Sequence, residues 1–221
     1  MRDDTFSSEM LSAADWDELS ANPERLVDDV RPGVRRLAIA RCGDALAAGD
    51  ESVRLVLERV LLGSENAADR TASAEALGRS DRRSVAPLLE AGADSTVAVV
   101  EAAVTALGEI ADVSAVPWLL TVAQTHRETI VRESAVAALG AIGDPQAIEV
   151  LLELVGNGPP QVRRRCVVAL TVFDDERIEP ALRTAAHDRN PMVREVAEMV
   201  VGHHTEWQRL EVGDNADEKS D

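Results

Sequence analysis

Small and apolar residues recur along the chain with the spacing of an α-helix, and the whole pattern repeats about every 31 residues. In each copy, three such positions lie four residues apart, which places them on one face of a helix. A partial copy begins at Asp69 and ends at Leu77. The pattern therefore predicts a series of equivalent helices, whose stripes are Val34/Ala38/Cys42, Val99/Ala103/Leu107, Val131/Ala135/Leu139, Val162/Cys166/Leu170 and Val193/Ala197/Val201.

A second helix is predicted after each of these first helices. An aspartate is placed to cap its N-terminus, and an apolar anchor and an apolar pair follow. A glycine stands near the end of most first helices, where we expect it to adopt the left-handed conformation that terminates a helix. The glycines are Gly43, Gly78, Gly108 and Gly140; the aspartates are Asp81, Asp112, Asp144 and either Asp174 or Asp175; the anchors are Val85, Val116, Ile148 and Ile178.

A single helical hairpin of this length cannot bury its own apolar stripe, so consecutive hairpins must stack. The sequence thus predicts an all-α fold, a right-handed α-solenoid of about five to six hairpins. We expect a loose N-terminus over residues 1–12, capping helices over 13–32, and the repeat solenoid over 33–202. Residues 203–221 are expected to form an acidic C-terminal extension that is disordered at its end.

The segment Val131 to Leu152 reads V-R-x-x-A-x-x-A-L-G-x-I-G-D-P-x-A-I-x-x-L-L. This pattern resembles the HEAT-like repeats first described in phycobilisome (phycocyanobilin) lyases, and the resemblance extends over about residues 34–201. Asp69 and Thr171 depart from it, at the first apolar position and at the glycine position. The matching positions all serve packing, capping or turns. The resemblance therefore implies the fold, in proteins that are mostly binding scaffolds and of which some attach bilin chromophores.

The charge balance narrows the classes of partner. The chain has 40 acidic and 23 basic residues, a net charge of −17, and Lys219 as its only lysine. Such a chain repels polyanions, so we expect no nucleic-acid partner. It has no long apolar segment, and we expect no membrane association and a cytoplasmic location. The acid excess and the lack of lysine fit either a halophilic origin or a high-GC genome, and the size of the net charge favours the halophilic one.

No residue pattern points to catalysis, a cofactor or a metal. Cys42 and Cys166 occupy stripe positions, which indicates small core residues rather than reactive thiols. Because the chain lacks paired metal-ligand spacings, its histidines are interpreted as helix-end or surface residues. These are His126, His187, His203 and His204.

The candidate binding surface lies on the second helices, which usually line the concave face of such solenoids. Trp118 is either a contact residue or packs on the neighbouring repeat. The outward, mostly acidic row of residues on these helices, named at the end of this paragraph, is either a binding strip or a solvated face. Arg164 and Arg165 are candidate contacts on the first helices. The aligned Arg35, Arg70, Arg132, Arg163 and Arg194 are interpreted as forming internal pairs. The remaining candidates are Glu90, Thr121, Glu149, Glu153, Glu179 and Arg183.

The sequence therefore predicts a non-enzymatic scaffold or adaptor that binds another protein with a basic surface. One alternative is a bilin-lyase-like enzyme that attaches a chromophore. The other is a helical-repeat protein that binds nucleic acid along the first-helix arginines.

The halophilic interpretation predicts that stability depends on salt. Screening by molar KCl should raise the melting temperature, because it weakens repulsion among the excess carboxylates. Thermal unfolding followed by circular dichroism in dilute buffer and in molar KCl tests this. Equal melting temperatures in the two buffers would rule the interpretation out.

Overall fold

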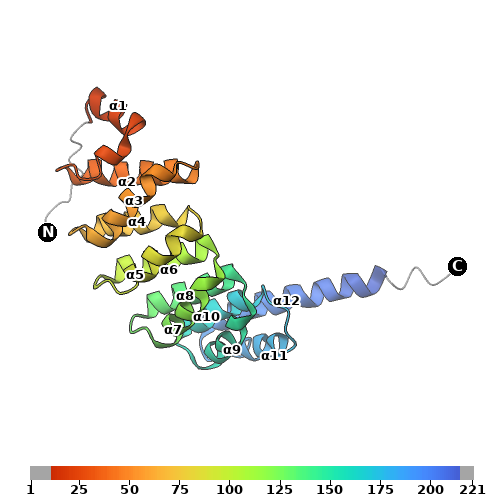
Figure 1. Ribbon diagram of the computed structural model, residues 1–221. Coiled ribbons are helices and arrows are strands. Elements are labelled where there is room, and N and C mark those ends of the chain that lie inside the picture. The colour runs from red at the N-terminus through yellow and green to blue at the C-terminus, as the bar shows by residue number, and fades with distance from the viewer. Residues whose placement is uncertain (1–10, 215–221) are drawn as a thin grey trace. The chain divides into compact units, whose positions relative to one another are not determined.

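The computed structural model describes residues 11–214, with side chains through residue 202, and this part of the chain folds into α-helices joined by 3-10 turns and loops (Figure 1). The predicted all-α class of helical hairpins is confirmed. The expected loose N-terminus and the end of the C-terminal extension lie largely outside the described residues, at 1–10 and 215–221. No helix among the described residues is both long and apolar enough to cross a membrane.

The chain divides into two compact units, Met1–Ile110 and Ala111–Asp221. In the first unit, α2, α4 and α6 pack side by side as first helices, and α3 and α5 pack against them as second helices. Helix α1 and the turn η1 (Pro23–Arg25) lie against α2, in the segment expected to cap the repeats. The helices are α1 (Ala13–Ala21), α2 (Pro32–Ala47), α3 (Arg54–Gly63), α4 (Ala67–Gly78), α5 (Val85–Ala91) and α6 (Val97–Ile110).

The second unit has the same two layers. Its first helices α8, α10 and α12 pack in succession, and the second helices α7, α9 and α11 contact one another and the first helices. Helix α12 continues beyond the repeat pattern into the expected C-terminal extension. The helices are α7 (Val116–Thr125), α8 (Thr129–Ile142), α9 (Ile148–Asn157), α10 (Pro160–Leu170), α11 (Ile178–Ala185) and α12 (Pro191–Asp214).

The predicted stripes form the core of both units, except that Val201 at the end of the last stripe is only partly buried. Ala38, Cys42, Ala103, Ala135 and Cys166 are fully buried, because their small side chains allow neighbouring first helices to approach closely. The predicted anchors of the second helices are buried as well: Val85, Val116, Ile148 and Ile178.

The predicted role of the first-helix glycines is wrong. None of Gly43, Gly78, Gly108 and Gly140 has a positive φ, and all four belong to the helices themselves. A Cβ on Gly43 would lie 2.8 Å from the Cβ of Ala76 on α4, and one on Gly140 would lie 2.9 Å from the Cβ of Ala169 on α10. At these positions glycine is required by the close approach of the next helix.

The left-handed residue that ends a first helix comes later. It is Gly49 after α2, with φ 96°, Ala111 after α6, with φ 55°, and Gly143 after α8, with φ 69°. Alanine tolerates this conformation less well than glycine because its Cβ crowds the backbone.

The predicted aspartate caps are confirmed, but each caps a turn that precedes the second helix rather than the helix itself. Each accepts a hydrogen bond from the backbone N–H two residues later and so opens a turn from which the second helix continues, a 3-10 turn in every case except before α11. Asp50 caps the turn before α3 in the same way, a site that the repeat pattern did not predict. The predicted caps are Asp81, Asp112, Asp144 and, of the two candidates in the last copy, Asp175.

On each of five first helices, one arginine forms a hydrogen bond with the segment of chain that precedes the helix. We call these residues, Arg35, Arg70, Arg132, Arg163 and Arg194, the arginine ladder. Each donates to a backbone carbonyl at or just after the end of the preceding element, where carbonyl groups lack helical partners. The acceptors are the carbonyls of Asp29 and Val30, Ser64, Ala123, Gly158 and Asp188, in that order.

Three ladder arginines also bind a carboxylate of the next repeat. Arg70 forms a bidentate pair with Asp94, and Arg163 forms one with Asp188. Arg35 binds Asp69 through Nε alone, at 2.7 Å. The prediction of internal pairs with carboxylates is therefore confirmed for Arg35, Arg70 and Arg163, whereas Arg132 and Arg194 donate to backbone carbonyls. Hydrogen bonding to the neighbouring guanidinium lowers the pKa of Asp94 and of Asp188.

The Arg163–Asp188 pair provides a test of the ladder. Arg163 is 1% exposed, so Arg163→Met leaves a largely buried carboxylate without its partner and should cost about 3–5 kcal/mol in the free energy of unfolding. The matched control is Arg183→Met, which breaks the exposed pair with Glu179 and should cost less than about 1 kcal/mol. Urea unfolding of the two variants measures both. Equal losses would show that the ladder pair has no special structural role.

Candidate functional site

The predicted binding residues on the second helices lie largely at the surface. Glu90 is exposed on α5 of the first unit, whereas the others belong to the second unit. Trp118 is half-buried on α7, so its ring presents only part of its surface to solvent. The other predicted residues are exposed: Thr121 on α7, Glu149 and Glu153 on α9, and Glu179 and Arg183 on α11.

Polar contacts connect these second helices to one another. Glu149 on α9 accepts from Arg177, just before α11, at 2.7 Å. Glu153 accepts from Gln124 on α7 at 3.5 Å. Both carboxylates are exposed, so solvent screens these contacts and they contribute little to stability. The row therefore remains accessible to a partner.

Arg164 and Arg165 lie apart from this row. Both are on α10, and each donates to Glu133 on α8 at 3.2 Å. Glu133 is mostly buried, whereas the two arginine side chains are 35% and 40% exposed. The structure thus places the predicted contact residues of the second unit in two groups, one on each layer of helices.

A groove lies next to the second-helix row of the second unit, with a volume of about 370 Å³. Its apolar lining includes Leu170, Phe173 and Leu182, and its other lining residues include four carboxylates. This combination suits a partner segment that carries both apolar and basic side chains. The carboxylates belong to Asp174, Asp175, Glu176 and Glu179.

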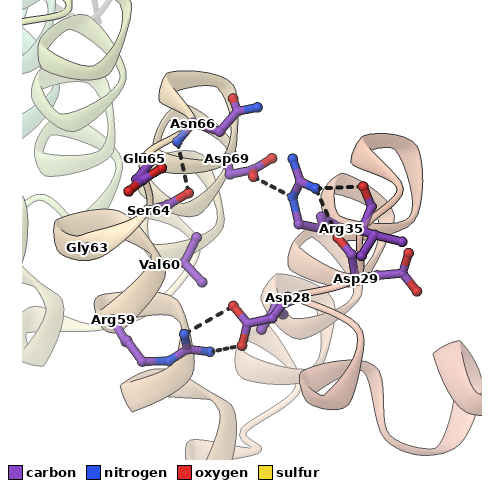
Figure 2. Close-up of a pocket in the computed structure, with 12 residues that line it drawn as sticks. Asp28, Asp29, Arg35, Arg59, Val60, Gly63, Ser64, Glu65, Asn66 and Asp69 are labelled. Carbon is purple, nitrogen blue, oxygen red and sulfur yellow. Dashed lines mark hydrogen bonds and ion pairs between the residues drawn. The ribbon is translucent and has the colours of Figure 1, made fainter.

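A larger cavity of about 460 Å³ lies in the first unit, between the segment before α2, the end of α3 and the start of α4. Figure 2 shows its polar residues on these elements. At one side, Arg59 and Asp28 form a bidentate pair, at 3.1 and 2.8 Å. The remaining polar lining consists of Asp29, Arg35, Ser64, Glu65, Asn66 and Asp69.

Asp69 is the buried carboxylate of this cavity, with only 2% of its surface exposed. Figure 2 shows its side chain directed from α4 toward Arg35, whose Nε donates to Oδ2. Its Oδ1 is buried and has no hydrogen-bond partner. Asp69 was not among the site residues predicted from the sequence, where its only signal was its departure from the apolar stripe.

Both cysteines are buried in the core, as predicted. Burial raises the pKa of the Cys42 thiol to about 11 and that of Cys166 to about 12. A nucleophilic cysteine requires the opposite shift, toward a thiolate at neutral pH. Neither cysteine is therefore suited to attack a substrate. The described residues include no cluster of three or more potential metal ligands, and the side chains of His203 and His204 lie outside them.

Comparison with known proteins confirms the resemblance to HEAT-like repeats. A family model of HEAT repeats matches residues 93–170, about a third of the chain. No curated protein sequence matches the chain.

Several solved structures share the fold. The YibA protein of Escherichia coli is 17% identical, with a TM-score of 0.61, over 96% of this chain and 80% of its own. The complex of CpcE and CpcF of phycocyanin lyase from Nostoc sp. gives 21% identity and a TM-score of 0.59, over 79% of this chain and 73% of the other. A computationally designed armadillo repeat protein for modular peptide recognition is 15% identical, with a TM-score of 0.50, over 80% of this chain and 95% of its own. At these identities the likeness extends to the fold alone.

The raised pKa values predict that the thiols are unreactive in the folded protein. Iodoacetamide at pH 8 should modify Cys42 and Cys166 at least about 100-fold more slowly in the native protein than in urea, because the buried thiol is both inaccessible and protonated. Mass spectrometry of the quenched reaction measures the two rates. Rapid native labelling of either cysteine would reopen a covalent role for it.

Proposed function

We propose that this protein is a non-enzymatic scaffold or adaptor that binds another protein through a basic surface of that partner. The fold supports this proposal, because stacked helical hairpins present extended surfaces without requiring an active site. The designed armadillo repeat protein of similar fold is described as built for peptide recognition.

The observation that carries the proposal is the internal use of the arginines. The ladder arginines bind carbonyls and carboxylates within the protein, and Arg54 is buried among Glu51, Asp81 and Ser84. Because these arginines are engaged internally, they add little positive charge to the surface of a chain that already has an excess of carboxylates. A surface of this kind attracts and orients a basic partner and repels an acidic one.

We propose the second helices of the second unit as the contact surface. It comprises Trp118, Thr121, Glu149, Glu153, Glu179 and Arg183, with the apolar groove beside it supplying area that a partner can bury. A half-buried tryptophan is a suitable anchor, since a partner can cover the rest of its ring at little conformational cost. Glu90 in the first unit, and Arg164 and Arg165 on α10, are secondary candidates.

The two alternatives have less support. Chromophore attachment through a cysteine of this chain does not fit two buried thiols with raised pKa values. A nucleic-acid groove would need the first-helix arginines to be available to phosphates, whereas the ladder arginines are engaged inside the protein.

The proposal is tested by affinity capture at native ionic strength, with the partner identified by mass spectrometry. The bait variant is Trp118→Ala/Glu149→Arg/Glu153→Arg, which removes the anchor and changes the charge of the surface by four units. The matched control, Glu195→Arg/Glu198→Arg, makes the same charge change on exposed positions of α12.

A stoichiometric protein recovered with the wild type and the control, and reduced at least about tenfold with the triple variant, is the expected result. Circular dichroism must show that all three baits are folded. Equal recovery with the triple variant would contradict the proposed surface. The absence of any stoichiometric protein with the wild type would contradict the scaffold function.

A further inference from the structure

Three ladder arginines bind a carboxylate, and we call each such pair a rung. The cavity beside Asp69 occurs at the rung that differs from the other two. In the rungs Arg70–Asp94 and Arg163–Asp188, Nε and Nη2 of the arginine bind both carboxylate oxygens of the aspartate. In each of these rungs, Oδ1 also accepts the backbone N–H of the residue two positions later. These two carboxylates are fully satisfied.

The equivalent loop position in the Arg35 rung holds Ser64. It lies five residues before the start of the stripe, as Asp94 and Asp188 do, and its hydroxyl likewise accepts the backbone N–H two residues later. The carboxylate for Arg35 comes instead from Asp69, at the first stripe position, where the other five copies have valine. In this rung the carboxylate is therefore on the helix, whereas in the other two it is in the loop.

This change leaves a buried acceptor at the wall of an open cavity. Arg35 reaches Asp69 through a single hydrogen bond, so Oδ1 stays without a donor. A buried carboxylate oxygen without a partner is costly, and most such groups in proteins are satisfied by a protein group, water or a ligand. Asp69 lines the cavity of about 460 Å³, so a donor bound in the cavity lies next to its carboxyl group.

The charge around the cavity favours a cationic donor. Asp28, Asp29, Glu65 and Asp69 line it, against two arginines, Arg35 and Arg59. Asp29 is paired with a third arginine, which also binds another aspartate outside the cavity, so an excess of two negative charges remains. Glu65 is exposed and makes none of the ion pairs found among the described residues.

We propose that this cavity binds the cationic end of a basic side chain, a guanidinium or an ammonium group, carried by a partner protein. The cation donates to Oδ1 of Asp69 and lies near the carboxylates of Asp28 and Glu65. Its charge offsets the local excess of carboxylates, and its N–H group supplies the hydrogen bond that the Arg35 rung lacks. Only the statement that the group belongs to a protein rests on the proposed function; binding of the cation itself does not.

The site can be tested without a partner by NMR on the ¹⁵N-labelled full chain. Nα-acetyl-arginine amide and Nα-acetyl-lysine amide serve as cationic probes, and Nα-acetyl-citrulline amide serves as a neutral probe of nearly the same shape as the arginine derivative. At least one cationic probe should shift the backbone amide signals of residues 64–69 in a saturable way. The citrulline probe should bind at least tenfold more weakly.

Two variants locate the site. Asp69→Asn keeps the shape of the side chain and removes its charge, and should weaken binding at least tenfold. Its control, Glu75→Gln, makes the same charge change at an exposed position of α4 and should leave binding unchanged. The double variant Ser64→Asp/Asp69→Val restores the arrangement of the other rungs without altering the net charge. It should fold with a melting temperature at or above that of the wild type and lose the binding.

Three results would overturn the proposal: no saturable shift with either cationic probe, equal binding of citrulline, or unchanged binding by the folded double variant. The double variant keeps the test decisive if Asp69→Asn fails to fold. Failure of probe binding together with a partner captured on the second helices would reject this site alone. Probe binding without any captured partner would leave the site intact and reject the scaffold function.

Discussion

The guanidinium group of the arginine ladder is the interaction on which the repeat structure depends. A second helix ends in carbonyls that have no helical partner, and the next first helix must begin close to them. One planar group with five donors can satisfy these carbonyls and also hold a carboxylate of the following repeat. Arg163 does both, through Gly158 and Asp188. A lysine could not form this combination of bonds, since its ammonium group lacks the planar fork.

The ladder also determines what the surface offers to a partner. Arginines that are buried or half-buried within the repeats contribute little positive potential outside them. The carboxylates of the second helices, such as Glu149 and Glu153, are exposed and take part only in contacts that solvent screens. These exposed carboxylates are therefore accessible to another protein. Under the proposed function, fold stability and partner selection depend on the same distribution of arginines.

The cavity of the first unit shows how changes at two positions of a repeated pattern can produce a candidate site. The rung at Arg35 retains the arginine and its bonds to backbone carbonyls. Only the position of the carboxylate differs, because Ser64 replaces the loop aspartate and Asp69 replaces a core valine. The surrounding hairpins remain unaffected, since each repeat contacts only its neighbours. A solenoid can therefore vary one rung locally at limited cost to the whole fold.

The sequence by itself determined the hairpins, the buried stripes, the aspartate caps and the internal role of the ladder. These features depend on helical periodicity, on hydrogen bonds between residues close in the chain and, for the ladder, on an arginine that recurs at one repeat position. Only the tertiary structure shows why Gly43 and Gly140 are glycines, since the reason is the close approach of a helix about 30 residues away in the chain. It also decided that Arg164 and Arg165 share Glu133, and that Asp69 keeps an unsatisfied oxygen beside a cavity. Such features arise from distances between separate repeats, which the periodicity of one helix does not encode.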